Sequence, residues 1–234
     1  MSADERKLSI INAAKPLFAA NGFNGTSMRQ IAAAAKVSGA LLYKHFPSKE
    51  AMHKEILSYV GRISNIAEKE FKEMEPGTET LVLLVFFIYR AILLEVPGHG
   101  EQQKMHERLL FYSLLEHVSY AQMVFDKISI NYFDIAQASY DAAVQDGDII
   151  ETNSDHSNLF WFVHHLAMSL NLCHLSPIPA FSYKMPKEKL IDDAILFALR
   201  GMGLTDNAIR KYYKPKKLKI YIKGLFFSNE TDNA

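Results

Sequence analysis

The sequence has almost none of the cysteine that secreted proteins use for cross-links. Among 234 residues there is one cysteine, Cys173, which cannot form a disulfide within the chain. Residues 2–9 (SADERKLS) are polar and do not form the apolar segment of a signal peptide. Both features predict a protein of the reducing cytoplasm.

Long hydrophobic runs are also missing. The longest spans 81–89 and ends at Arg90, and the next spans 159–163 and ends at His164. A helix needs about 20 apolar residues to cross a bilayer. We therefore expect both runs to be buried helix segments, and we expect no membrane partner.

The sequence shows no motif that carries catalysis or holds a cofactor. It has no nucleophile elbow, phosphate loop or paired-carboxylate motif, so we expect neither an enzyme nor a cofactor. The histidines lack the close spacing of metal ligands, and the adjacent pair His164-His165 would point in different directions from a helix. Packed or polar histidines are the favoured interpretation for His99, His106, His117, His164, His165 and His174, with no metal site.

The charges balance overall but not along the chain. The sequence holds 26 Lys and Arg against 26 Asp and Glu. Residues 1–55 carry a net charge of +4 (eight cations, four anions), residues 56–205 carry −8 (eleven and nineteen), and residues 206–234 carry +4 (seven and three). A basic head on an acidic body predicts that only the head meets a polyanion.

Apolar residues recur three and four positions apart almost throughout, and no run alternates as a strand would, which predicts an all-α fold. Proline, glycine and capping residues divide the pattern. The expected helices lie near residues 4–21, 27–35, 39–46, 47–76, 78–95, 101–117, 120–146, 155–175, 187–202 and 206–213. We group them into a three-helix head (1–50), a larger helical body (51–205) and a basic C-terminal extension (206–234).

Residues 26–46 read TSMRQIAAAAKVSGALLYKHF and predict two short helices around a turn at Lys36-Val37. Thr26 and Ser38 are placed to cap the two helices. The positions that can face inward are apolar, namely Ile31, Ala32, Ala35, Val37, Leu42 and Phe46, with Ile11, Leu17, Phe18 and Phe23 closing the core. This arrangement is typical of a helix-turn-helix, whose second helix enters the major groove of DNA.

A set of short matches in register gives a more specific indication. It comprises Leu17-Phe18, Gly22-Phe23, Thr26-Ser27, Ile31-Ala32, Ala35, Val37-Ser38, Leu42-Tyr43, His45-Phe46 and Ser48-Lys49-Glu50. Together they make the stretch from Ile11 to Met52 closely resemble the N-terminal signature of the TetR family. The resemblance implies a transcription regulator that binds a palindromic operator as a homodimer, usually represses, and is released when an effector enters the body.

Three features depart from the family pattern. Lys36 stands where many members have glycine, which predicts a left-handed lysine at a cost of roughly 1 kcal/mol. Pro16 lies inside the first expected helix, and the tail after Leu204 is long and basic.

The expected DNA contacts divide into two kinds. Hydroxyls, cations and helix N-termini contact phosphates, which selects Thr26 and Ser38; the resemblance adds Tyr43, His45 and Lys49. Base edges need side chains that reach into the groove, which selects Arg29, Leu41 and Lys44, while Gly39 and Ala40 permit close approach. Because this set offers few hydrogen-bonding groups, part of the specificity is expected to come from DNA shape or from contact of Leu41 with thymine methyl groups.

The resemblance places the dimer interface in the last two body helices, 155–175 and 187–202. Spacings of three and four select Trp161, His165, Met168, Leu172, Ile195 and Leu199 for the buried seam. The aromatic residues of the body fit either an ordinary core or an apolar effector pocket. We expect a pocket lined by Ile63, Phe86, Tyr89, Phe111, Phe125 and Tyr132, which takes an apolar or aromatic effector because the body carries −8.

Two alternatives stay open. The stretch 210–223 carries seven cations interleaved with tyrosine and isoleucine, so it either reaches nucleic acid or another acidic surface, or packs on the acidic body, which we favour. The chain as a whole is either the regulator described above or a helical protein–protein interaction module that does not bind DNA. Duplex binding that weakens steeply with salt separates these two, because it marks phosphate contact.

Overall fold

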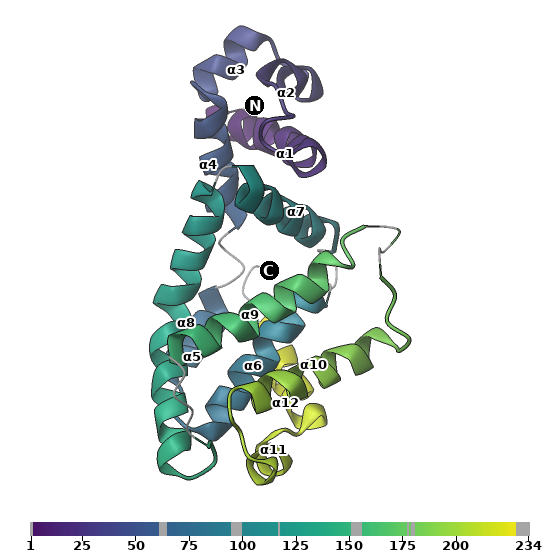
Figure 1. The fold of residues 1–234 in the computed structure, drawn as a ribbon. Coiled ribbons are helices and arrows are strands. Elements are labelled where there is room, and N and C mark those ends of the chain that lie inside the picture. The colour runs from purple at the N-terminus through teal and green to yellow at the C-terminus, as the bar shows by residue number, and fades with distance from the viewer. Residues whose placement is uncertain are drawn as a thin grey trace. The chain divides into compact units, whose positions relative to one another are not determined.

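The computed structural model describes residues 2–60, 65–94, 100–116, 118–150, 156–176, 178 and 181–227. These residues form helices and connecting turns (Figure 1), which confirms the all-α fold. The helices are α1 (Ala3–Asn21), α2 (Met28–Ala34), α3 (Gly39–His45), α4 (Lys49–Val60), α5 (Asn65–Glu73), α6 (Thr78–Leu93), α7 (Gly100–Glu116), α8 (Ser119–Gln145), α9 (His156–Leu172), α10 (Lys187–Gly201), α11 (Asp206–Tyr212) and α12 (Pro215–Phe227). No helix in the described ranges is long and apolar enough to cross a bilayer.

The chain folds into two compact units. The first contains residues 1–64 and 97–127, and the second contains residues 65–96 and 128–234. Helix α8 contributes to both, and α7 belongs to the same unit as α1–α4. One long helix was expected over 47–76, and the described part of this range holds α4 in the first unit and α5 in the second.

Helix α1 supplies much of the core of the first unit. Its start is a capping box, in which the Ser2 side chain accepts from the Glu5 N–H and the Glu5 side chain accepts from the Ser2 N–H. It ends at Gly22, whose φ of 71° suits glycine and whose N–H donates to the Phe18 carbonyl. The buried apolar residues of α1 to α4 are Ile10, Ile11, Ala14, Phe18, Ala19, Phe23, Ile31, Ala32, Leu42, Phe46, Met52 and Ile56.

The turn between α2 and α3 is fixed by backbone hydrogen bonds. The Lys36 N–H donates to the Ala33 carbonyl (3.1 Å) and the Val37 N–H donates to the Ala32 carbonyl (3.0 Å), which is the pattern of a Schellman motif. Lys36 has a φ of 53°, the left-handed conformation predicted from the sequence. The turn therefore sets the angle between the two helices at the cost of a strained lysine.

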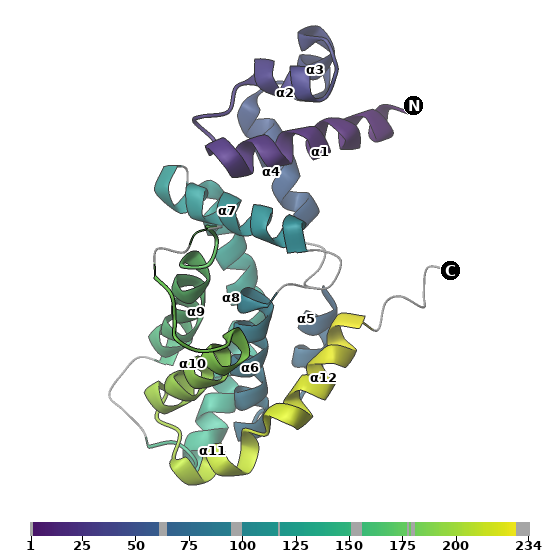
Figure 2. The same cartoon turned by 90° about the vertical axis from the view of Figure 1, so that its right-hand side faces the viewer.

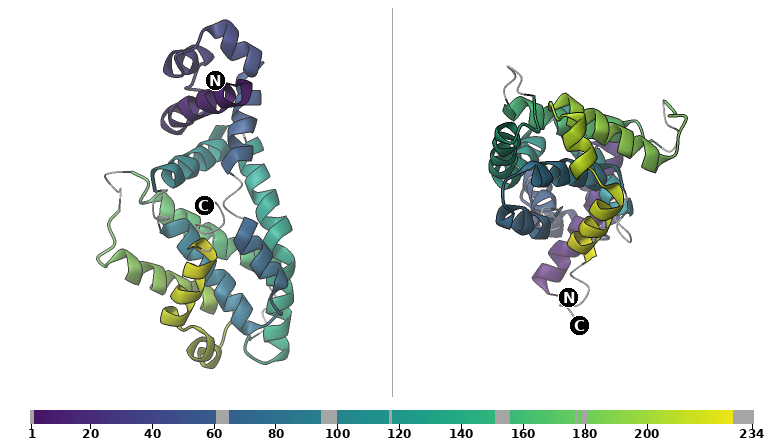
Figure 3. Two further views of the ribbon diagram at one scale, coloured as in Figure 1. Left: turned by 180° about the vertical axis from the view of Figure 1, so that it is seen from behind. Right: turned by 90° about the horizontal axis from the view of Figure 1, so that it is seen from below.

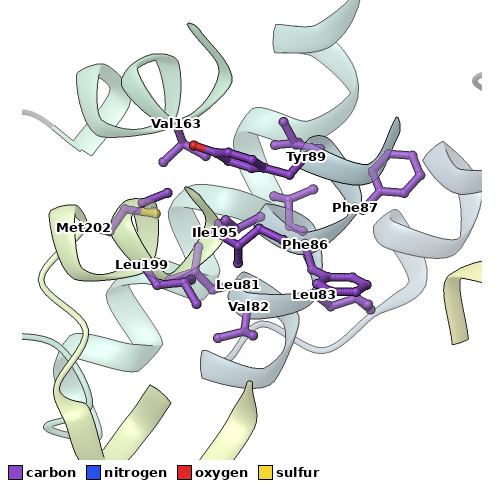
Figure 4. Close-up of a cluster of buried hydrophobic side chains, with 14 of the residues drawn as sticks. Leu81, Val82, Leu83, Phe86, Phe87, Tyr89, Val163, Ile195, Leu199 and Met202 are labelled. Carbon is purple, nitrogen blue, oxygen red and sulfur yellow. The ribbon is translucent and has the colours of Figure 1, made fainter. Parts of the chain in front are cut away.

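The second unit is built around α6, which lies between α9 and α12 (Figure 2). Almost every residue of α6 is buried, because neighbours cover more than one of its faces. Its side chains meet Val163 of α9 and Ile195 and Leu199 of α10 in the main core (Figure 4). The run 81–89 is thus a buried helix segment, as its length predicted.

The basic C-terminal extension packs on the second unit, and it contains α12, a helix that was not expected from the sequence. Leu218 and Ile222 of α12 are buried in the core of this unit. Figure 3 shows α12 in yellow from behind, where it lies against α6. Lys217 pairs with Glu79 (2.9 Å) and Lys219 pairs with Glu188 (2.8 Å), so the tail meets acidic residues of the body, as we expected.

Candidate nucleic-acid interface

Helix α3 presents one face to the head core and the opposite face to solvent. Leu42 is fully buried, whereas the outward residues Gly39, Ala40, Tyr43 and Lys44 are exposed, with 55% of Tyr43 accessible. Gly39 and Tyr43 are four positions apart, as are Ala40 and Lys44, so these residues lie together along one side of the helix. A phenol and an ammonium thus project from a helix whose first two residues are small enough for close approach to a ligand.

The ends of α3 add to this surface. Ser38 is exposed and caps the helix, because its Oγ accepts from the Leu41 N–H at 3.2 Å. Leu41 and His45 are half-buried at the edges of the outward face. Gly39 has open space where a side chain would project, with no atom within 4 Å of an ideal Cβ.

Helix α2 places further polar side chains beside α3. Arg29, Gln30 and Lys36 are exposed, and only Arg29 was selected from the sequence. The Gln30 side chain accepts from the Ser27 N–H at 2.8 Å, and the Ser27 hydroxyl caps α2. Gln30 and Ser27 were missed because Thr26 was taken as the capping residue; the cap lies one residue later.

The charge of the head has one sign over a long stretch. Residues 6–49 contain seven lysines and arginines and no aspartate or glutamate. Arg29, Lys36 and Lys44 from this stretch are all exposed on α2, α3 and the turn between them. This stretch therefore attracts a polyanion, and none of its own side chains is a carboxylate that would repel it.

Two residues expected to contact DNA are used inside the protein. Thr26 is 1% exposed, and its hydroxyl is within hydrogen-bonding distance of the Gly22 carbonyl (2.8 Å) and the Leu17 carbonyl (3.1 Å). Because it is buried, Thr26 cannot reach a phosphate, and we remove it from the candidate interface. The Lys49 ammonium donates to the Phe23 carbonyl (2.7 Å) and the Thr26 carbonyl (2.9 Å), and it lies 4.2 Å from the centre of the Phe23 ring. Lys49 thus positions the loop before α2.

Helix α7 holds the same loop from another side. The Glu116 carboxylate accepts from the Asn24 N–H at 3.0 Å, and the Tyr112 hydroxyl donates to the Ala20 carbonyl at 3.4 Å. A Cβ on Gly22 would lie 2.7 Å from Glu116 Oε1, so a side chain there would displace the Glu116 carboxylate, and the φ of 71° itself favours glycine. Both contacts join α7 to the end of α1 and the loop that precedes α2.

The residues selected for a dimer seam fall on different faces. Leu172 is 51% exposed, His165 is exposed and Trp161 is half-buried, whereas Met168 is 6% exposed. Ile195 and Leu199 are fully buried in the core of the second unit (Figure 4). They contact their own subunit and have no surface for a partner, so they leave the candidate seam. The large apolar residues that are exposed on these helices are Phe162 (64%) and Leu172 (51%) of α9 and Phe197 (69%) of α10.

The residues selected for an effector pocket are divided between the two units. Phe86, Tyr89 and Tyr132 are buried in the second unit, while Phe111 and Phe125 are half-buried in the first. Ile63 lies outside the described residues. The Tyr89 hydroxyl points towards Val163 (Figure 4), has no hydrogen-bond partner in the described structure, and burial raises its pKa. The pocket formed by these six residues stays a prediction.

A small cavity in the second unit is lined by other residues. It has a volume of about 10 Å³, close to the space of one water molecule. Its walls come from α8, α9 and the end of α10, namely Phe133, Ala136, Gln137, Tyr140, His156, Phe160 and Met202. Its polar side is formed by His156, whose Nδ1 lies 3.0 Å from Gln137 Nε2.

Two histidines, His106 and His164, pack against aromatic side chains. His106 of α7 contacts the hydroxyl of the buried Tyr120, and burial lowers the pKa of His106 to about 4. Burial, assisted by the neighbouring His165, also lowers the pKa of His164 to about 4. In the described parts of the chain, no group of three His, Cys, Asp or Glu side chains is placed to hold a metal ion.

Comparisons with known proteins agree with the geometry of the head. Residues 10–56 match the sequence profile of bacterial regulatory proteins of the tetR family. The HTH-type transcriptional regulator UidR of Escherichia coli strain K12 is 40% identical over 107 residues, which cover 42% of this chain. The match covers 53% of UidR, so the chain spans about half the length of this relative.

Solved structures match over most of the chain. A bacterial regulatory protein in the tetR family from Rhodococcus RHA1 has a TM-score of 0.61 at 19% identity and covers 88% of this chain and all of its own. AibR, solved in complex with isovaleryl coenzyme A and operator DNA, has a TM-score of 0.57 at 21% identity and covers 82% of this chain and 97% of its own. The profile match shows that residues 10–56 are similar to bacterial regulatory proteins of the tetR family, and the solved structures share the all-α fold of this chain.

Proposed function

We propose that this chain is a transcription regulator that binds operator DNA through the outward face of α2 and α3. The observation that carries the proposal is the acid-free stretch 6–49, whose cations Arg29, Lys36 and Lys44 are exposed on α2, on α3 and in the turn between them. An α3 that enters the major groove would bring Lys44 to base edges and Tyr43 to the phosphate backbone. Because the cellular DNA is its target, we place the protein in the cytoplasm and assign it no catalytic role.

Gly39 gives a sharp test of close approach. A methyl group at this position meets nothing inside the protein, so Gly39→Ala leaves the fold intact and adds a methyl only where DNA would approach. We expect Gly39→Ala to weaken duplex binding while the melting temperature stays equal or rises. Gly201→Ala is the matched control, since Gly201 is also an exposed helical glycine with open space around it.

Charge variants test the same face. Lys44→Ala and Arg29→Ala should weaken binding to the preferred duplex, by about 1–3 kcal/mol for a direct base contact, and alter the preferred base at one position. Lys187→Ala is the control, because Lys187 is exposed at the start of α10. If the control loses as much affinity as the head variants, or if binding ignores salt, the head does not read DNA and the interaction-module alternative gains support.

We further propose that the regulator acts as a homodimer through the exposed side of α9 and α10. His165 follows Phe162 by three positions and Leu172 follows His165 by seven, which is two helical turns, so the three residues share one side of α9. Phe197 is exposed on α10. Exposed phenylalanines on adjacent helices are unusual unless another surface covers them. A dimer also supplies the second recognition helix that an operator needs.

The dimer proposal has its own test. Phe162→Glu and Phe197→Glu should each give a monomer in sedimentation experiments, because a buried carboxylate without a partner is costly. Ile130→Glu is the control, since Ile130 of α8 is 71% exposed and lies outside the proposed seam. A wild-type chain that sediments as a monomer at micromolar concentration would overturn the proposal.

We propose that a small apolar or aromatic effector binds the helical body and releases the DNA. AibR was solved with both an acyl coenzyme A and operator DNA, which supports a regulator that senses a ligand. In this chain the contacts of Glu116 and Tyr112 join α7 to the loop before α2, so a shift of α7 would move the head. Linkage requires the effector to favour the arrangement that does not bind DNA.

A thermal-shift screen tests the effector proposal. A ligand at a hundred times its dissociation constant should stabilise the protein by about 2.7 kcal/mol and weaken operator binding. Glu116→Gln should reduce the second effect more than the first, because it alters the connection to the head and not the ligand site. If no apolar ligand changes the melting temperature, the sensing proposal fails while the DNA-binding proposal is unaffected.

A further inference from the structure

Helix α12 presents a basic outward face that the proposed regulator does not use. Its inward side is fixed by Leu218 and Ile222, which are 5% and 3% exposed in the core of the second unit. The opposite side carries Lys216, Ile220 and Lys223, all exposed, with Ile220 at 76%. Ile220 follows Lys216 by four positions and Lys223 follows Ile220 by three, so the three residues form one continuous stripe along the helix.

The cations of this stripe are not used in ion pairs of the described structure. Lys217 and Lys219, which flank it, neutralise Glu79 and Glu188 respectively. Lys216 and Lys223 have no carboxylate within ion-pair distance in the part of the chain that is described. Burial, together with the negative charge of Glu70, raises the pKa of Tyr221 at the edge of the stripe. The Glu70 carboxylate therefore limits the positive surface on that side.

The composition of the stripe indicates what it binds. A surface that contacts phosphates of a duplex is built from polar and charged groups, and phosphates offer no apolar partner to an isoleucine at its centre. A lipid surface instead accepts the apolar side chain between its headgroups while the lysines on either side meet anionic groups. Tyr221, 43% exposed beside Ile220, has the amphipathic ring that suits such an interface.

We propose that the stripe Lys216–Ile220–Lys223, with Tyr221 beside it, binds the surface of an anionic membrane. The contact is peripheral and reversible, because it uses one helix face with one aliphatic side chain and a few lysines. The length of the hydrophobic runs could not indicate this contact, because run length identifies only segments that span a bilayer. The sequence analysis led us to expect no membrane partner, and the proposal reverses that expectation for a surface contact.

The experiment measures co-sedimentation of the full-length protein with vesicles of phosphatidylcholine alone or mixed with phosphatidylserine. We expect binding only to the anionic vesicles, weakening as salt rises. Each lysine near such a surface contributes about fivefold in affinity, so Lys216→Ala with Lys223→Ala should reduce binding by about 25-fold. The matched control is Lys184→Ala with Lys187→Ala, two exposed lysines of the same unit outside α12, which should change binding less than twofold.

Ile220 distinguishes a lipid partner from nucleic acid. Ile220→Ser should weaken vesicle binding by about tenfold, through loss of apolar contact, and leave binding to a non-operator duplex unchanged. Ile220→Trp should retain binding and show a blue shift of its added fluorescence on anionic vesicles. The proposal is overturned if the wild type does not bind the vesicles, or if the control pair loses as much vesicle binding as Lys216→Ala/Lys223→Ala. It is also overturned if Lys216→Ala/Lys223→Ala loses duplex binding while its vesicle binding stays intact. Operator binding by the head is measured alongside and should not change.

Discussion

The strained turn between α2 and α3 gives a prediction whose size can be worked out from the backbone. Lys36 has a φ of 53°, where a side chain costs about 1–2 kcal/mol relative to glycine. Glycine also makes the unfolded chain more flexible, which offsets about 0.4–1 kcal/mol. With the middle of each range, about 1.5 and 0.7 kcal/mol, Lys36→Gly should stabilise the turn by about 0.8 kcal/mol.

The assay is native-state hydrogen exchange of the Val37 amide, which donates to the Ala32 carbonyl at 3.0 Å and closes the turn. A stabilisation of this size slows exchange through local opening by about two- to fivefold, provided that the turn opens locally. Lys36→Ala is the control, because it removes the same charge and keeps the strain. Equal protection in the glycine and alanine variants would show that the left-handed lysine carries no cost, and the argument from backbone strain would fail.

Three further predictions concern the supports of the head. Gly22→Ala should destabilise the head by more than about 1 kcal/mol in chemical unfolding, since the left-handed φ and the nearby Glu116 oxygen both oppose a methyl group. Gly39→Ala is the control and should not destabilise the head. Lys49→Met should weaken binding to every duplex by a similar factor without changing base preference, because it releases two loop carbonyls, and Lys49→Arg should restore part of the loss. Burial lowers the pKa of His106 from 6.5 in the unfolded chain to about 4 in the folded protein, so the unfolded chain binds more protons between these pH values. The free energy of unfolding of the wild type should therefore decline as pH falls from 6.5 to 4, and it should decline less in His106→Gln.

The sequence predicted features that depend on local chemistry. Gly22 ends α1 and Ser38 caps α3 because backbone geometry at helix ends restricts which residues fit, and Lys36 occupies the turn conformation that its position implied. The cap of α2 was placed one residue early, since Thr26 and Ser27 are both good capping residues and only packing decides between them. In the structure the Thr26 hydroxyl turns inward to carbonyls of α1 and the following turn.

Features that depend on tertiary contacts could not be predicted. Spacings of three and four place Ile195 and Leu199 on one face of α10, but they do not say whether α6 or a second subunit covers that face; here α6 does. The Lys49 ammonium could equally have pointed to solvent, and only the fold brings two loop carbonyls to it. Helix α12 was missed because lysines interrupt its apolar pattern, although Pro215 at its first position is a common helix start.

Selection of binding sites from a pool of random duplexes, with the full-length wild-type protein, tests the central claim most directly. If α3 of two subunits reads the major groove, the enriched sequences should contain two inverted half-sites whose centres are about one helical turn, near 34 Å, apart or a multiple of this. Enrichment should disappear in Arg29→Ala/Lys44→Ala and persist in the control Lys187→Ala. A pool that shows no enrichment, or that enriches equally with the head variant, would contradict the account.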